Sequence, residues 1–112
     1  KILNSNLSHE LDLEGAVPYT QMLKDQINGK NDSWAIRWHV SMFLENKLCL
    51  YPGRSLVKNI GLDATGTHCL DTDGFDVELA KEPIYPENHL IKESAIARNA
   101  FKEFFKKSKF LL

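Results

Sequence analysis

The sequence has few cysteines, no long apolar run and no excess of charge of either sign. Two cysteines, Cys49 and Cys69, are too few for a disulfide framework, and no CxxC or CxxH spacing predicts a zinc site. Lys and Arg number 14 against 15 Asp and Glu, so a nucleic-acid partner is not expected. We expect two reduced, partly buried thiols in a cytosolic protein, and a disulfide between neighbouring strands is the alternative.

The chain also lacks an apolar run near the ~20 residues that a membrane span requires, and no secretory signal pattern opens it. Its 112 residues, 43% of them hydrophobic, fit one compact domain with a small core. The first residue is not methionine, and residues 1–18 show no sustained hydrophobic period. We therefore expect residues 1–112 to form a single fragment domain of a longer protein.

Hydrophobic spacing predicts about three helices and a small sheet of short strands, an α+β (partial α/β) class. Pro18 and Gly29 fit the start and the stop of the first main helix, and a turn of helix near residues 8–13 is a weaker signal. The predicted elements are helices over residues 18–28, 31–47 and 92–107, and strands over residues 48–52, 55–61 and 75–79.

The helix over residues 31–47 carries two apolar stripes. One contains Trp34, Trp38 and Met42, and the other contains Ile36 with the apolar residues that follow it at helical spacing. Two such stripes predict a helix that is buried on more than one side, with a narrow exposed sector at Glu45 and His39.

Two charged residues at the start of this helix allow a functional and a structural interpretation. Asp32 could be a general base held at a helix N-terminus, but it, or Ser33, could equally be a plain N-cap. Arg37 could bind a phosphate or carboxylate of a substrate, or its head could reach the surface or a structural ion pair. From spacing alone, the structural interpretation is favoured for both.

A glycine-containing loop, "SLVKNIGLDATGTHC", ends at His68 and Cys69. His68 could ligate a divalent metal, but one histidine supplies one ligand, and a turn histidine is the simpler interpretation. The loop lacks the GxGxxG spacing of phosphate-binding loops. The following "DTDG" could share a cation but is favoured as a turn between strands.

Together these segments resemble the C-terminal part of bacterial family 2 glycosyltransferases, which are GT-A nucleotide-sugar enzymes. The resemblance rests on an acid heading a Trp-rich helix, "NDSWAIRW", on "LCLYP", on the "SLVKNIGLDATGTHC" run and on a basic, Phe-rich tail. The segment "LDLEGAVPYTQMLKDQINGK" is similar to the family's lead-in, and the likeness covers roughly residues 11 to 80. It implies the C-terminal fragment of a GT-A fold, with the nucleotide-binding half absent.

The resemblance also implies roles. Asp32 matches the catalytic base of inverting members, while Asn31 stands where the family usually has a first acid. His68 would complete the shell of a Mg²⁺ or Mn²⁺ ion in the full-length enzyme, with no metal expected on the fragment. Trp34, Arg37 and Trp38 would bind substrate, although core packing is an alternative for the tryptophans.

The implied partners, through the full-length protein, are a nucleotide-sugar donor and a glycan or lipid-linked acceptor. The implied localisation is the cytoplasm, with a possible position at the inner face of the membrane. The implied process is the synthesis of surface polysaccharide or glycolipid. Because the nucleotide-binding half is absent, we expect no glycosyl transfer by the fragment alone. Apolar surface left uncovered should favour its self-association.

A different class of function fits the same sequence. The chain could be a non-catalytic assembly module, whose lysine-rich C-terminal helix docks on a partner or on an anionic membrane. Asp32 and His68 distinguish the two functions: one shared open groove favours the enzyme, and opposite orientations favour the module.

Overall fold

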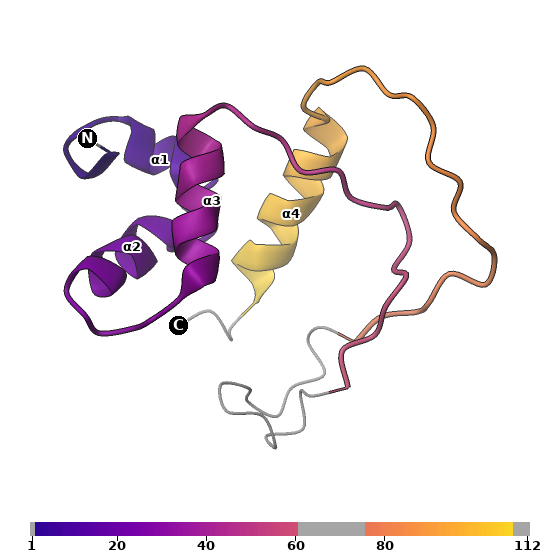
Figure 1. Ribbon diagram of the computed structural model, residues 1–112, viewed down its shortest axis with the longest axis horizontal. Helices are drawn as coiled ribbons and strands as arrows, with labels where there is room; N and C mark the ends of the chain where they lie inside the picture. The colour runs from indigo at the N-terminus through magenta and orange to yellow at the C-terminus, as the bar shows by residue number, and fades with distance from the viewer. Residues whose placement is uncertain (1, 61–75, 109–112) are drawn as a thin grey trace. The chain divides into compact units, whose positions relative to one another are not determined.

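The computed structural model describes residues 2–60 and 76–108, and its regular elements there are helices (Figure 1). A short 3-10 helix, η1, precedes four α-helices, so the predicted helices are confirmed, including the short one near residue 8. Their bounds are η1 Ile2–Asn4, α1 Leu7–Leu11, α2 Tyr19–Ile27, α3 Trp34–Leu44 and α4 Ala95–Lys107. None of the helices in the described ranges is long and apolar enough to cross a bilayer.

The described chain divides into two units, one formed by residues 1–48 with 91–112 and the other by residues 49–90. The core of the first unit is a cluster of Ile2, Leu11, Ile36 and Val40. Leu11 retains 1% of its surface exposed, so α1 is anchored by one residue that is almost wholly removed from water. Partly buried side chains of α2 and α3 pack around this cluster: Tyr19, Met22, Leu23 and Phe43.

Polar contacts join α1 to α2. The Asp12 carboxylate accepts a hydrogen bond of 2.6 Å from the backbone N–H of Thr20, in the first turn of α2. That N–H has no partner within its own helix, so a side chain eight residues earlier satisfies it. The Thr20 hydroxyl in turn donates to the Ser8 carbonyl at 3.3 Å.

The ends of α2 and α3 share one C-terminal geometry. After α2, Gly29 has φ +70°, and Lys30 N–H donates to the Asp25 carbonyl at 2.8 Å. After α3, Asn46 has φ +51°, and Lys47 N–H donates to the Met42 carbonyl at 2.9 Å. Both are Schellman motifs, which explains the stop at Gly29 that the sequence predicted.

The second unit, in its described residues 49–60 and 76–90, contains no strand. Its single bridge pairs Ser55 with Leu79, and Ala80 N–H donates to the Ser55 carbonyl at 2.8 Å. The prediction of strands over residues 48–52, 55–61 and 75–79 is therefore wrong in the residues of these ranges that the structure describes, and so is the predicted sheet. These apolar residues lie mostly exposed, so no second layer covers a sheet face and stabilises it.

Two further features of the second unit can be compared with the sequence. Cys49 is exposed, so the expected partial burial of its thiol is wrong. Lys58 Nζ lies 2.6 Å from Asp76 Oδ1, and the hydrogen bond and charge of this ammonium hold the pKa of Asp76 below its usual range.

Candidate functional site

An open, largely apolar pocket of about 330 Å³ lies between α2 and the first half of α3. Its lining comes from the start of α2, from the connection that follows α2 and from α3: Tyr19, Met22, Asn31, Ser33, Trp34, Ala35, Ile36, Trp38 and His39. Volume and lining of this kind suit a small ligand with flat apolar faces and a few polar groups.

Both tryptophans border this pocket from the solvent side. Trp34 is 74% exposed and Trp38 is 55% exposed, so the predicted burial of their stripe is wrong. The opposite stripe, with Ile36 and Val40, is the one that packs into the core. A helix with two apolar faces needs a covering layer on each, and the first unit supplies it on one side only.

Asp32 lies between two pocket-lining residues and points outward, with 90% of its side chain exposed. It is not the N-cap: Ser33 occupies that position with φ −114°, and its side chain makes no capping hydrogen bond. Instead, Ser33 N–H donates to Gln26 Oε1 at 2.7 Å. The Asp32 carboxylate is thus left available for a contact outside the helix end.

Arg37 makes that contact. Its Nη2 lies 2.5 Å from Asp32 Oδ1, and its Nε donates to the Ser33 carbonyl at 3.4 Å. Within residues 2–60 and 76–108, Asp32 Oδ2 has no hydrogen-bond or ion-pair partner. The guanidinium therefore fixes one carboxylate oxygen and leaves the other open to solvent. Arg37 has the ion pair that one interpretation of the sequence expected; its part in binding substrate stays a prediction.

Asn31 adds a polar group that sequence reasoning did not assign to a site. Its Nδ2 donates to the Met22 carbonyl at 3.4 Å, and its Oδ1 is buried without a hydrogen-bond partner in the described part of the chain. A buried acceptor without a partner costs free energy, so a rearrangement that brings a donor to it would be favourable. The resemblance places Asn31 where the family usually has an acid, but it does not predict that this amide is buried.

His39 also differs from expectation, since it is half-buried rather than part of an exposed sector. Its ring lies against Tyr19, with the ring centroids 4.2 Å apart and the planes tilted by 33°. Burial lowers the pKa of His39 from its ordinary value of 6.5, so the imidazole is neutral at pH 7. The neutral ring therefore lines the pocket as an aromatic group and adds no positive charge to it.

The predicted metal ligand His68 lies outside the described residues, as do Cys69, the two glycines of its loop and the "DTDG" segment. In the ranges that are described, no group of three or more His, Cys, Asp and Glu side chains could hold a metal ion. The Mg²⁺ or Mn²⁺ ion that the resemblance implies stays a prediction. The proposed groove shared by Asp32 and His68 stays a prediction.

Comparison of the chain with protein-family models, with curated proteins and with solved structures finds no match.

Proposed function

We propose that this chain provides the acceptor side of a glycosyltransferase, as the resemblance of its sequence implies. One observation carries the proposal: two exposed tryptophans border a pocket at the same helix start that presents an exposed carboxylate. Indole faces suit the apolar C–H faces of a sugar ring, and exposed aromatic groups of this size mark binding surfaces.

In this proposal the acceptor sugar rests on Trp34 and Trp38, with one hydroxyl directed at Asp32 Oδ2. As that hydroxyl oxygen bonds to the anomeric carbon of the donor, Asp32 accepts its proton. The bond from the anomeric carbon to the nucleoside diphosphate breaks, and the diphosphate leaves with the electron pair. Arg37 holds Oδ1, so the carboxylate keeps one orientation during the transfer.

The remaining roles are assigned to the full-length protein. Its other half binds the nucleotide sugar. The described residues of this chain contribute only the acceptor-binding surface and the base. The 112-residue chain alone is therefore inactive in transfer. We propose, as the resemblance implies, that the enzyme acts in the cytoplasm on a glycan or lipid-linked acceptor.

The test is a transfer assay on the full-length protein, using UDP-glucose, UDP-N-acetylglucosamine and GDP-mannose as donors and p-nitrophenyl glycosides as acceptors. Asp32→Asn keeps the side-chain shape but removes the base, so kcat should fall by about a hundredfold or more. The matched control is Asp25→Asn, which makes the same change at a carboxylate of α2 paired with Lys30. It should leave kcat within about twofold.

Two results would count against the proposal. Equal rates for wild type and Asp32→Asn would remove Asp32 as the base. Failure of the full-length protein to release nucleoside diphosphate from every donor, with and without acceptor, would remove the glycosyltransferase function itself.

A further inference from the structure

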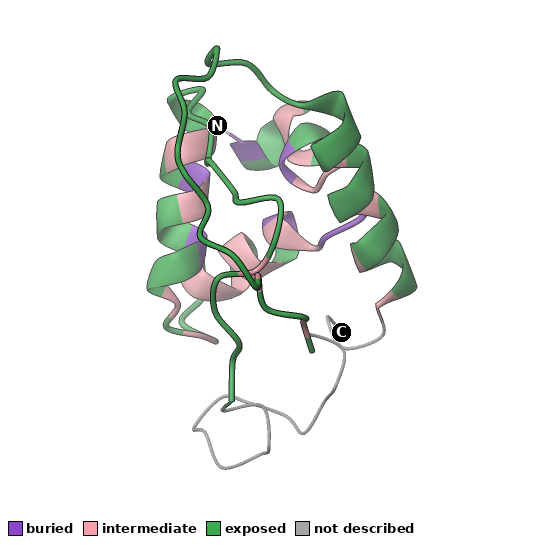
Figure 2. Cartoon of the chain, turned by 90° about the vertical axis from the view of Figure 1, so that its right-hand side faces the viewer, coloured by how far each residue is buried: buried purple, intermediate pink, exposed green. Residues whose placement is uncertain are grey.

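Helix α4 packs against the rest of the first unit along one line of its surface, and part of its apolar face stays exposed. Three of its side chains, Arg98, Lys102 and Phe105, are half-buried, and they follow one another at spacings of four and three residues. Spacing of this kind places them along one line of the helix surface. No residue of α4 is buried, and Figure 2 shows the helix in the colours of intermediate and exposed residues alone.

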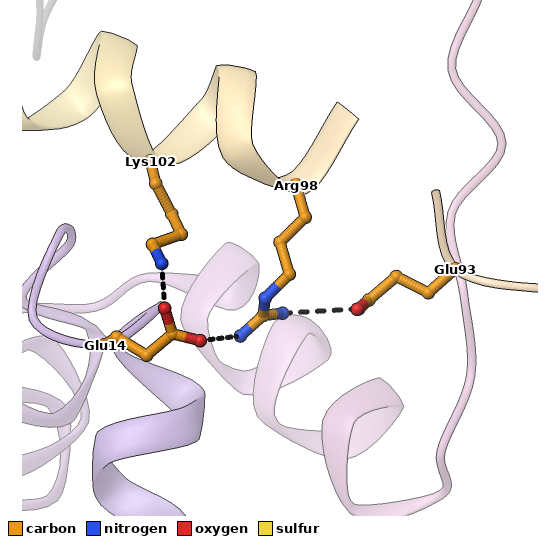
Figure 3. Close-up of polar contacts among 4 residues, drawn as sticks. All are labelled: Glu14, Glu93, Arg98 and Lys102. Carbon is orange, nitrogen blue, oxygen red and sulfur yellow. Dashed lines mark hydrogen bonds and ion pairs between the residues drawn. The ribbon is translucent and has the colours of Figure 1, made fainter. Parts of the chain in front are cut away.

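The polar contacts of this attachment centre on Glu14 (Figure 3). Arg98 Nη2 lies 3.1 Å from Glu14 Oε1, and Lys102 Nζ pairs with Glu14 Oε2. Arg98 Nη1 also lies 3.2 Å from Glu93 Oε2, ahead of the helix. One carboxylate of the turn after α1 thus contacts two cations one helical turn apart, and this sets the rotation of α4 about its axis.

That rotation leaves the apolar stripe of α4 toward solvent. Ile96 is 85% exposed, Ala97 and Ala100 are exposed, and Phe104 is 41% exposed. A surface helix of a globular protein normally turns such a stripe toward the core. In α4 the ion pairs hold Arg98 and Lys102 against the protein, so Ile96 and part of Phe104 are presented to solvent.

Charge accompanies this stripe. Helix α4 carries four cations, Arg98, Lys102, Lys106 and Lys107, against the single acid Glu103. Glu14 engages the first two, whereas Lys106 and Lys107 are exposed and form no ion pair with a described residue. Ile and Phe on one face, with lysines beside them, are the composition of helices that lie in the plane of a membrane surface.

We propose that α4 docks this protein on an anionic membrane, with Ile96 and Phe104 inserted among the lipids and Lys106 and Lys107 against the headgroup phosphates. The charges favour this occupant over an apolar protein groove, because such a groove would leave two adjacent ammonium groups without compensation. This inference does not depend on glycosyl transfer and extends beyond it.

The experiment is vesicle co-sedimentation of the 112-residue chain at low salt. Vesicles of phosphatidylcholine alone are compared with vesicles in which a third of the lipid is phosphatidylglycerol. Wild type should bind the anionic vesicles and release at high salt, since screening weakens the lysine contribution. Lys106→Glu with Lys107→Glu should weaken binding on the order of twentyfold or more, because each lysine near the surface contributes about fivefold.

The apolar face is tested with a matched pair of isoleucines. Ile96→Glu should weaken binding more than about tenfold, because it places a carboxylate in the inserted stripe. Ile27→Glu makes the same change at a residue of α2 that is 64% exposed, and it should leave binding within about twofold. Circular dichroism should show the wild-type helix content for both, since neither residue is buried.

Three outcomes would overturn the proposal. Wild type could fail to bind anionic vesicles, it could bind neutral ones equally well, or Ile27→Glu could weaken binding as much as Ile96→Glu. The main alternative is self-association, which sedimentation velocity measures. If the wild type self-associates but does not bind vesicles, and Ile96→Glu abolishes the self-association, the stripe binds a second copy of the chain.

Discussion

Tyr19, the first residue of α2, packs its ring against His39 of α3, with the ring centroids 4.2 Å apart. This contact joins the two helices at the edge of the pocket and removes part of the imidazole from water. A half-buried imidazole is neutral more readily than one in water, so the contact makes the stability of the first unit dependent on pH.

The first prediction concerns this dependence. Because burial lowers the pKa of His39 in the folded state, the unfolded chain binds the proton more tightly. The contribution of His39 to stability is therefore full above its ordinary pKa of 6.5 and is lost as the pH falls below that value toward the lower folded pKa. In urea unfolding at pH 7.5 and pH 5, His39→Gln should lose less stability on acidification than wild type.

The matched control is His89→Gln, at an exposed histidine of the other unit. It should keep the wild-type difference between the two pH values. An unchanged difference in His39→Gln would show that the acid sensitivity arises from other groups.

A second prediction concerns the turn after α2. Gly29 has φ +70° and open space around the position of a Cβ, so alanine would meet no clash but would have to adopt the left-handed conformation. Gly29→Ala should therefore cost about 1 kcal/mol of unfolding free energy. Gly53→Ala also adds its methyl group in open space, but its φ lies outside the left-handed region, so it should change stability by less than about 0.5 kcal/mol. Equal effects of the two changes in urea unfolding would contradict the assignment.

The sequence predicted the helices well because their signals are local. Proline or a short polar residue precedes each of the four α-helices, glycine or asparagine lies just after two, and apolar residues recur at helical spacing between. The burial of each helix face is not a local property. The Trp34 stripe and the Ile36 stripe look alike in sequence, and only the packing of the chain determines which one meets the core.

The same limit applies to the candidate site and to the sheet. The sequence offers Asp32 and Arg37 as candidates for a site or for structural roles, but their ion pair depends on side-chain geometry that spacing does not specify. The residues expected to form strands are apolar enough, yet strands need partners far along the chain, and the described ranges contain one bridge. Asn31 contacts Met22 of α2, and His39 contacts Tyr19 of the same helix. These contacts depend on how α2 packs against α3, which the local sequence does not specify.

A third prediction tests the core. Leu11 belongs to a five-residue helix and is 1% exposed, so its side chain connects α1 to the cluster with Ile36. Leu11→Ala should cost about 2–5 kcal/mol, which is a large part of the stability of a small domain. Leu50→Ala removes the same atoms from an exposed position and should cost less than about 0.5 kcal/mol. Thermal unfolding by circular dichroism would contradict the described core if both variants melted alike.

The last prediction uses the fact that Trp34 and Trp38 are the two tryptophans of the chain. All tryptophan fluorescence therefore reports on the surface proposed to hold the acceptor sugar. In Trp34→Phe and in Trp38→Phe, the remaining indole should emit as a water-exposed tryptophan and be quenched readily by acrylamide. Added p-nitrophenyl glycoside should protect both indoles from acrylamide, whereas p-nitrophenol alone should not.

Because neither indole is buried, each of the two substitutions, Trp34→Phe and Trp38→Phe, should lower the free energy of unfolding by less than about 1 kcal/mol. Removing a tryptophan from a core costs about 3–5 kcal/mol. Poor quenching and a large loss of stability would place these side chains inside the protein and remove the sugar-binding face.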